Sequence, residues 1–292
     1  MQTLNMQQES FRIIQFTDLH LMYQDSDYQT YNLIKNCINH MKPDLVVITG
    51  DITMTLDNKN VIVFLRDFLD SFKVNWTFVF GNHDHESNYT LEEQADLYMQ
   101  GKYCLFEKGD PSLRGCGNYY IDLQKDEKTV AMLGFLDSHN SRTYINNQGN
   151  QKWTWDYIDF EQINDAVKNI NLLKEKKNDF SSLFFFHIPL IDFKTEIEEN
   201  LSNCVGHCYE DISCSDLDND FHYQLERTNT LRGVFVGHDH VCDFQFVKDK
   251  CLYAFGRCTG HYNYVKPDYV KGARIIDIDA LGNVKSNVIL EG

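Results

Sequence analysis

The sequence has no run of about 18 apolar residues, so no membrane-spanning helix is expected. It is also poor in basic residues, with 27 lysines and arginines against 43 acidic residues and a net charge of -16. Phosphate backbones and anionic membranes attract basic surfaces, so we expect neither nucleic acid nor a membrane as a partner. An acidic chain that handles phosphate must neutralise it locally, and bound metal ions would do so.

The first ten residues lack the apolar core of a signal peptide, and the nine cysteines, an odd number, are scattered along the chain. Both features favour a reducing, cytoplasmic location, or secretion if a signal peptide has been removed. The group Cys204, His207, Cys208 and Cys214 leaves two further alternatives open. One is a zinc site, although the spacing fits no common zinc pattern, and the other is a disulfide among Cys204, Cys208 and Cys214.

Apolar strands and amphipathic helices alternate in the first third of the chain. Apolar runs at 11–17, 45–49 and 76–80 predict buried strands, and apolar residues at helical spacing predict helices at 29–41 and 61–72. This order implies a sheet with parallel neighbours and right-handed crossovers.

The rest of the chain predicts a second sheet with further helices. The predicted elements are a hairpin of 119–123 and 129–136, a strand at 182–186, strands of a second sheet at 234–236, 244–247 and 252–255, closing strands at 274–278 and 284–290, and helices at 91–100 and 160–170. The acidic stretch 192–220 is expected to be a long surface loop, serving as a lid or specificity insert. Since no repeat or linker interrupts the chain, we expect one α/β domain, 1–292, of two packed mixed sheets with outer helices.

Polar side chains follow five of the predicted strands. The candidate ligands among them are Asp18, His20, Asp51, Asn82, His187, His238 and His240. The carboxyl ends of parallel strands converge at one edge of a sheet. Carboxylate, amide and imidazole donors suit Mn²⁺, Fe²⁺ or Zn²⁺. Seven ligands are too many for one ion, and Asp51 could bridge two ions that polarise phosphate oxygens and turn a bridging water into hydroxide.

The series Asp18-x-His20, Gly50-Asp51, Gly81-Asn82-His83-Asp84, His187 and Gly237-His238-Asp239-His240 resembles the calcineurin-like metallophosphoesterase superfamily, in that family's order. The resemblance implies a four-layer α/β/β/α sandwich with two metal ions. The first ion would take Asp18, His20, Asp51 and His240, and the second would take Asp51, Asn82, His187 and His238. It also makes His83 the general acid for the leaving group, oriented by Asp84.

A narrower resemblance covers the second half of the chain. Phe185-Phe186-His187-Ile188-Pro189-Leu190 and the stretch Gly233 to Val241 are similar to a purple-acid-phosphatase-like branch in plants and fungi. True purple acid phosphatases carry a tyrosine ligand three residues after the bridging aspartate, and Met54 stands at that position here. A ferric–tyrosinate centre is therefore not expected.

These features predict a metal-dependent phosphatase. A metal-bridging hydroxide would attack a phosphomonoester, either a phosphorylated small molecule or a phosphoprotein. A phosphodiesterase acting on cyclic nucleotides or glycerophosphodiesters is the alternative, and a non-catalytic binding scaffold is the remote one. For substrate contacts, Arg257 is a candidate for a phosphate oxygen, and His261, Tyr262 and Tyr264 are candidates for the pocket wall. A solvated aromatic loop is the other interpretation of these last three.

Overall fold

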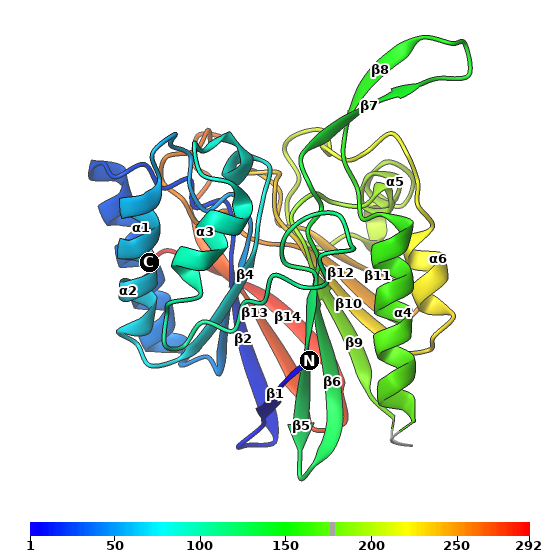
Figure 1. The fold of residues 1–292 in the computed structure, drawn as a ribbon, viewed down its shortest axis with the longest axis horizontal. Coiled ribbons are helices and arrows are strands. Elements are labelled where there is room, and N and C mark those ends of the chain that lie inside the picture. The colour runs from blue at the N-terminus through cyan, green and yellow to red at the C-terminus, as the bar shows by residue number, and fades with distance from the viewer. Residues whose placement is uncertain (176–178) are drawn as a thin grey trace.

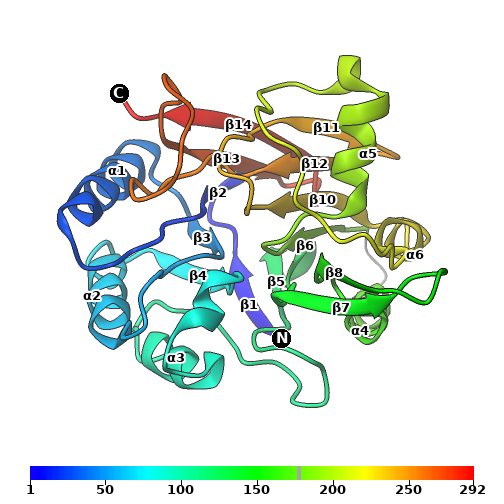
Figure 2. The ribbon, with the colours of Figure 1, turned by 90° about the horizontal axis from the view of Figure 1, so that it is seen from above.

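Two β-sheets pack face to face between two layers of helices in the computed structural model, which describes residues 1–175 and 179–292 (Figure 1). Five strands form one sheet, in the order β14-β13-β2-β3-β4, and seven form the other, in the order β1-β5-β6-β9-β10-β12-β11. Helices α1 to α3 cover the outer side of the first sheet, and α4 to α6 cover that of the second (Figure 2). The α/β/β/α sandwich predicted from the sequence is confirmed.

The first sheet is built by strands and crossover helices that alternate along the chain. Its elements are β2 (Ser10–Phe16), α1 (Asp25–Met41), β3 (Leu45–Thr49), α2 (Lys59–Asp70), β4 (Asn75–Val79), α3 (Leu91–Tyr98), β13 (Gly272–Asp279) and β14 (Val284–Leu290). Strands β2, β3 and β4 are parallel, as predicted. The last two strands were expected to close the second sheet, and that prediction is wrong, because β13 pairs antiparallel with β2. Such a pairing joins the two ends of the chain, which no local pattern specifies.

The second sheet takes its strands from the middle of the chain and from the N-terminus. Its elements are β1 (Gln2–Asn5), β5 (Tyr119–Lys125), β6 (Lys128–Phe135), α4 (Phe160–Lys174), β9 (Ser181–Phe185), α5 (Ile191–Glu199), α6 (Phe221–Glu226), β10 (Leu231–Val236), β11 (Gln245–Lys248) and β12 (Cys251–Phe255). Strand β1 was not predicted, because it lies at the sheet edge beside β5 and only alternate residues are partly buried. None of the described helices is long and apolar enough to cross a membrane.

The stretch 192–220 is more ordered than the loop that its acidity predicted. It begins within α5 and continues through a 3₁₀ turn, η2 (Leu201–Asn203). Phe193 is fully buried, and its ring meets those of Phe244 and Phe255 on the outer face of the sheet. This segment, which we call the acidic insert, is therefore anchored by its apolar residues and exposes its charges.

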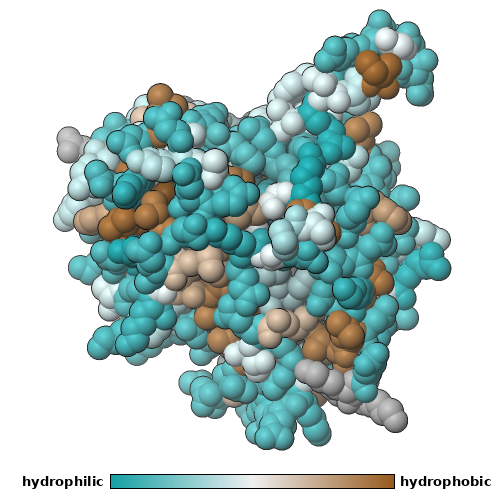
Figure 3. Space-filling model, viewed as in Figure 1, coloured by the Kyte–Doolittle hydropathy of each residue, from teal (hydrophilic) through white to brown (hydrophobic). Residues whose placement is uncertain are grey.

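A two-stranded hairpin, β7 (Ser141–Ile145) and β8 (Gln151–Trp155), was also not predicted. It projects from the body of the molecule (Figure 1), and its exposed alternate side chains give little apolar periodicity. Figure 3 shows a largely hydrophilic face with hydrophobic atoms near the end of this hairpin, where Ile145 is exposed.

A row of stacked aromatic rings fills the space between the sheets. The rings of Tyr119, Phe135, Phe185 and Phe235 come from the neighbouring strands β5, β6, β9 and β10, with centroids 4.8, 5.2 and 5.2 Å apart. Alternation along β9 sends Phe184 to the opposite face, against the helices. Because strand side chains have period two, one aromatic run supplies both cores.

We expect the Phe185→Ala substitution to lower the free energy of unfolding by about 3–5 kcal/mol, because it leaves a cavity between two rings that the sheets hold in place. Phe160→Ala, at an exposed ring on α4, should change it by less than about 0.5 kcal/mol. Chemical denaturation monitored by circular dichroism measures both. Equal effects of the two substitutions would contradict the importance of the stacked row.

Candidate metal centre

The predicted ligands lie where strands of both sheets end at a common edge. Asp18 and His20 follow β2, Asp51 follows β3, and His187 and His238 follow β9 and β10. The chain turns sharply at several of these ends, since Asp18, Asp51 and His238 have positive φ angles of 54°, 50° and 81°. Such angles are uncommon for residues with a side chain and cluster at functional sites.

Glycine is required beside the site for steric reasons. A Cβ atom at Gly81 would lie 2.2 Å from the Oδ1 atom of Asp51. At Gly50, φ is +85° and a Cβ atom would lie 2.5 Å from the ring of His187. Gly81 therefore lets the loops after β3 and β4 of the first sheet approach each other, and Gly50 lets the first sheet approach His187 of the second.

A first group of potential ligands consists of Asp18, His20, Asp51 and His240, all of them buried. One ligand atom from each lies within 4.8 Å of those of the others. The Nε2 atom of His20 is 3.2 Å from Asp51 Oδ2, and the Nε2 atom of His240 is 3.5 Å from Asp18 Oδ1. This is the set that the resemblance assigned to the first metal ion.

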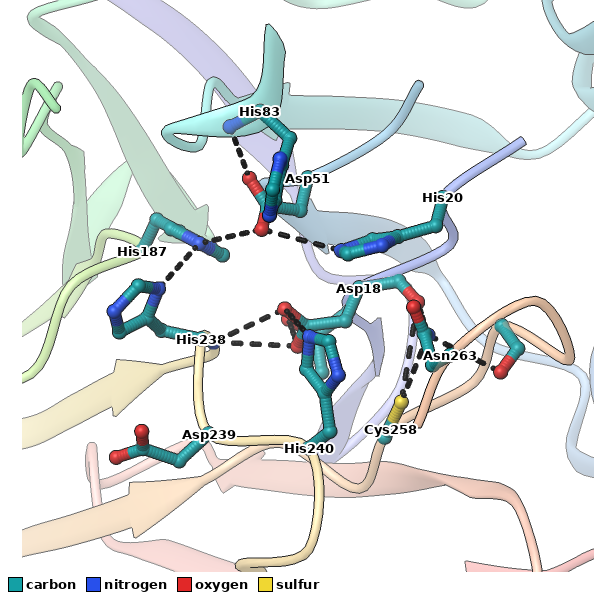
Figure 4. A network of polar contacts seen from close by, with 12 residues as sticks. Asp18, His20, Asp51, His83, His187, His238, Asp239, His240, Cys258 and Asn263 are labelled. Atoms are coloured by element: carbon teal, nitrogen blue, oxygen red, sulfur yellow. Dashed lines mark hydrogen bonds and ion pairs between the residues drawn. The ribbon is translucent and has the colours of Figure 1, made fainter. Parts of the chain in front are cut away.

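A second group consists of Asp51, His187 and His238, also buried and equally close together. His187 Nε2 lies 3.2 Å from Asp51 Oδ2, 3.2 Å from His238 Nδ1 and 3.1 Å from Asn82 Oδ1. The Oδ2 atom of Asp51 therefore faces an imidazole of each group (Figure 4). This placement suits a carboxylate that bridges two ions.

Hydrogen bonds and neighbouring charges set the orientation of His187 and the ionisation of Asp18 and His187. The backbone carbonyl of Thr49 accepts a hydrogen bond from His187 Nδ1, which directs Nε2 to the site. Burial opposes the ionisation of Asp18, yet the hydrogen bond and charge of His240 lower the pKa of Asp18 to about 2. Burial also opposes protonation of His187, but the Asp51 carboxylate outweighs it and raises the pKa of His187 to about 9.

Buried imidazole nitrogen atoms without a hydrogen-bond partner also support metal binding at this site. Among the described residues, His238 Nε2 and His240 Nδ1 are buried without a hydrogen-bond partner. Burial, together with the neighbouring His187, lowers the pKa of His238 to about 3, so this imidazole is neutral and has a lone pair to donate. Neutral imidazoles beside ionised carboxylates are the donors that Mn²⁺, Fe²⁺ and Zn²⁺ take, so the residues present fit a pair of such ions.

The expected orientation of His83 by Asp84 is not seen in the structure. Residues 83–86 form a 3₁₀ turn, η1 (His83–Glu86), and His83 Nδ1 lies 2.9 Å from Glu86 Oε1. Asp84 is fully buried and accepts hydrogen bonds from the backbone N–H groups of Gly81, Ile52 and Thr53. A 3₁₀ turn brings residues i and i+3 together, so this spacing is the signal that could have identified Glu86.

Asp84 instead joins the loop after β3 to the loop after β4. Its three backbone donors lie on the segments that carry Asp51 and Asn82. Burial raises the pKa of Asp84 to about 7, with a further contribution from the charge of Asp51. Asp84 therefore contributes to the relative placement of two ligands without touching the ring of His83.

A cavity of about 430 Å³ opens next to the first group. His20, His83 and His240 form one part of its wall, and His261 and Tyr262 form another. Met54, Asn263 and Tyr264 complete the lining. Met54, which occupies the position of the tyrosine ligand in purple acid phosphatases, thus borders this cavity. Its thioether is a poor ligand for ferric iron.

Arg257 does not line this cavity. Its guanidinium is buried against the carboxylate of Asp243, 2.5 Å away, and over the ring of Tyr269, at the wall of a separate cavity of about 650 Å³. The interpretation of Arg257 as a phosphate contact at the metal groups is therefore wrong. Its position after β12 suggested the site, but its side chain turns toward an internal ion pair.

Two aromatic rings contact the ligands themselves. The ring of Tyr264 stacks on His240 with centroids 4.3 Å apart, and its hydroxyl donates to Glu210, 2.6 Å away. The ring of Trp155, on β8, meets His238 edge-on at 4.4 Å. Neither Trp155 nor Glu210 was predicted, because both belong to segments without strand-end motifs.

The site consists of two groups of aspartate and histidine side chains that share one carboxylate. It lies at the strand ends of a two-sheet sandwich, and this arrangement is typical of dinuclear metallohydrolases. Residues 11–242 match the model of the calcineurin-like phosphoesterase family. The chain belongs to this family and is a metal-dependent phosphoric ester hydrolase.

Relatives in plants and yeast cover most of the chain. Probable inactive purple acid phosphatase 29 of Arabidopsis thaliana is 26% identical over 92% of this chain and 77% of its own length. Phosphatase DCR2 of Saccharomyces cerevisiae is 28% identical over 86% of this chain but only 47% of its own length, so the chain spans about half of that protein. The resemblance to a purple-acid-phosphatase-like branch of plants and fungi is thereby confirmed.

Solved structures share the fold at low sequence identity. GAP50, the anchor in the inner membrane complex of Plasmodium, aligns with a TM-score of 0.61 at 13% identity, covering 97% of this chain and 85% of its own. A dimetal phosphatase from Danio rerio aligns with a TM-score of 0.54 at 12% identity, covering 97% and 99%. At this identity the likeness concerns the fold alone.

We expect the Asp51→Asn substitution to abolish binding of both ions, because an amide removes the charge shared by the two groups. Asp239→Asn is the matched control: this buried carboxylate lies next to His238, but Figure 4 shows it turned away from the ligands. Metal content after reconstitution and dialysis measures both. Retention of two ions by Asp51→Asn would refute the shared carboxylate.

Metal binding near neutral pH should release a proton from His187. In the ion-free protein its pKa is about 9, so at pH 7 a proton occupies the nitrogen that an ion would take. Affinity should therefore rise with pH until about 9 and then level off. Titration calorimetry in buffers of different ionisation enthalpy counts the protons released. The same count from His187→Ala as from the natural protein would contradict this assignment.

Proposed function

We propose that the protein is a phosphomonoesterase in which His83 protonates the leaving group. The observation that supports this role most directly is the position of His83. Its ring borders the cavity together with His20 and His240, with the His20 ring centroid 4.9 Å away. Glu86 engages Nδ1, so Nε2 is the nitrogen that remains for a substrate oxygen.

Two ions held by the aspartate and histidine groups would polarise the phosphoryl oxygens and supply the activated water that attacks phosphorus. The residues of the chain set the geometry around that reaction. Asp51 would keep both ions at a fixed separation, and its Oδ1 atom also accepts the backbone N–H of His83, 2.9 Å away. This hydrogen bond links the proposed bridging carboxylate to the backbone of the proposed proton donor.

Glu86 is a positioning residue in this scheme. Its carboxylate lies 2.9 Å from Nδ1 of His83, which fixes the orientation of the ring and leaves Nε2 for the substrate. Glu86 is half exposed, so its influence on the ring is screened by water more than that of a buried carboxylate would be.

A monoester is favoured over a diester by the relatives that span most of the chain, since their names are those of phosphatases. A probable cyclic nucleotide phosphodiesterase of Moraxella catarrhalis is 32% identical over only 31% of this chain. Two substrate classes are proposed, a phosphorylated small molecule and a phosphoprotein. Comparing turnover across a panel of substrates from both classes distinguishes them.

The names of the plant relatives raise the alternative of a non-catalytic scaffold. In this chain both groups of potential ligands are complete, and His83 lines the cavity beside them. These features favour catalysis. One experiment distinguishes a catalyst from a scaffold. Ion-free protein is reconstituted with Mn²⁺, Fe²⁺ or Zn²⁺, and its activity is measured on phosphomonoesters, phosphopeptides and phosphodiesters. Two bound ions without turnover of any ester would establish the scaffold.

His83→Ala should bind both ions normally and lose about 10²–10⁴-fold in turnover on alkyl phosphates. The loss should be much smaller on a nitrophenyl phosphate, whose leaving group needs little protonation. Steady-state rates on the two substrates, together with metal content, test this expectation. Glu86→Gln should show the same selectivity more weakly.

His85→Ala is the matched control, since this histidine lies on the same turn but borders a different cavity. It should leave both rates nearly unchanged. An equal loss on both esters in His83→Ala would assign the ring to stabilisation of the phosphoryl group, and a loss of metal would make His83 a ligand.

A further inference from the structure

We propose that Cys208 and Cys242 are a modification site that forms a reversible disulfide by exchange with a low-molecular-weight disulfide such as oxidised glutathione. The two Sγ atoms lie 3.1 Å apart. Among the described residues, this is the one pair of cysteines whose sulfur atoms are in contact. The pair lies outside both groups of potential metal ligands, and it joins the acidic insert to the segment that follows His240.

The backbone geometry suits the bond. Cys208 and Cys242 face each other in an isolated antiparallel bridge. The flanking hydrogen bonds run from the N–H of Tyr209 to the carbonyl of Val241 and from the N–H of Asp243 to that of His207, at 3.3 and 2.9 Å. The two cysteines are thus a non-hydrogen-bonded pair, in which Cα atoms approach to about 4.5 Å. That separation lies within the range of about 4.4–6.8 Å that disulfides span.

Side-chain contacts hold the two segments together without the bond. Glu210 Oε1 accepts the backbone N–H of Val241 at 2.8 Å, and Asp243 Oδ1 accepts that of His207 at 2.7 Å. Because these contacts lie on both sides of the pair, the thiols are already placed for the second, intramolecular step. Oxidation therefore requires no rearrangement of the insert.

The two thiols differ in access, which sets the order of the steps. Cys208 is partly exposed, whereas Cys242 is fully buried. The Cys208 thiolate would attack one sulfur of glutathione disulfide, forming a mixed disulfide and releasing one glutathione thiolate. The Cys242 thiolate then attacks Cys208 Sγ and displaces the second glutathione. Two protein thiols are oxidised and one glutathione disulfide is reduced to two glutathiones, so atoms and electrons balance.

The test uses the full metal-loaded chain, first reduced and then equilibrated with oxidised glutathione. After an acid quench, the remaining thiols are alkylated in denaturant and counted by mass. The nine thiols of the chain should fall to seven, and a peptide map should contain one cross-linked pair joining Cys208 to Cys242. The thermal midpoint of the oxidised protein should shift upward, and dithiothreitol should reverse both changes.

Cys208→Ser should keep all of its eight remaining thiols under the same treatment. Cys204→Ser, in the same insert, should still form the Cys208–Cys242 link and is the matched control. Cys242→Ala provides a second variant and should also form no internal disulfide. Nine thiols after oxidation of the natural chain, or a cross-link that joins other cysteines, would overturn the proposal. These readouts do not depend on phosphatase activity, so they stand or fail separately from the proposed function.

Discussion

The carboxylate of Asp51 is the interaction on which the centre depends. It is buried where loops of both sheets meet, and its Oδ2 atom lies 3.2 Å from His20 and from His187. A buried charge is costly unless it is compensated, so the two imidazoles, and two ions when bound, stabilise it. The close approach that permits this arrangement requires glycine at positions 50 and 81. The positions of the strand ends, the glycines and the ligands are thus all set by the need to bury and compensate the Asp51 carboxylate.

Much of the fold could be predicted because its elements have local signals. The strand before Asp51 and the hairpin of β5 and β6 follow directly from apolar periodicity and turn residues. The partner of β13 could not be predicted in this way, because antiparallel pairing with β2 joins residues such as Arg274 and Gln15 across nearly the whole chain. Strand β1 was not predicted because its local signal is weak. An edge strand buries too little apolar surface to leave a pattern in the sequence.

The site was predictable to the level of residue groups but not of individual contacts. Motif order identified the side chains that cluster, because each follows a strand whose end is fixed by the sheet. The resemblance assigned Asp84 as the partner of His83, whereas the structure places Glu86 there, and both are acids on one short turn. Arg257 illustrates the same limit, because position after a strand does not determine which way a long side chain turns when Asp243 is within reach.

Two carboxylates within the ligand motifs organise backbone rather than metal. Asp84 accepts N–H groups from the loop after β3, and Asp239 accepts the N–H of Ser213 in the acidic insert. The insert meets the strand end again where Glu210 binds both Val241 and the hydroxyl of Tyr264, whose ring stacks on His240. A surface segment rich in negative charge is thus connected by hydrogen bonds to a metal-binding edge. Its contribution to the centre is made through the placement of the backbone after His238 and of the Tyr264 ring.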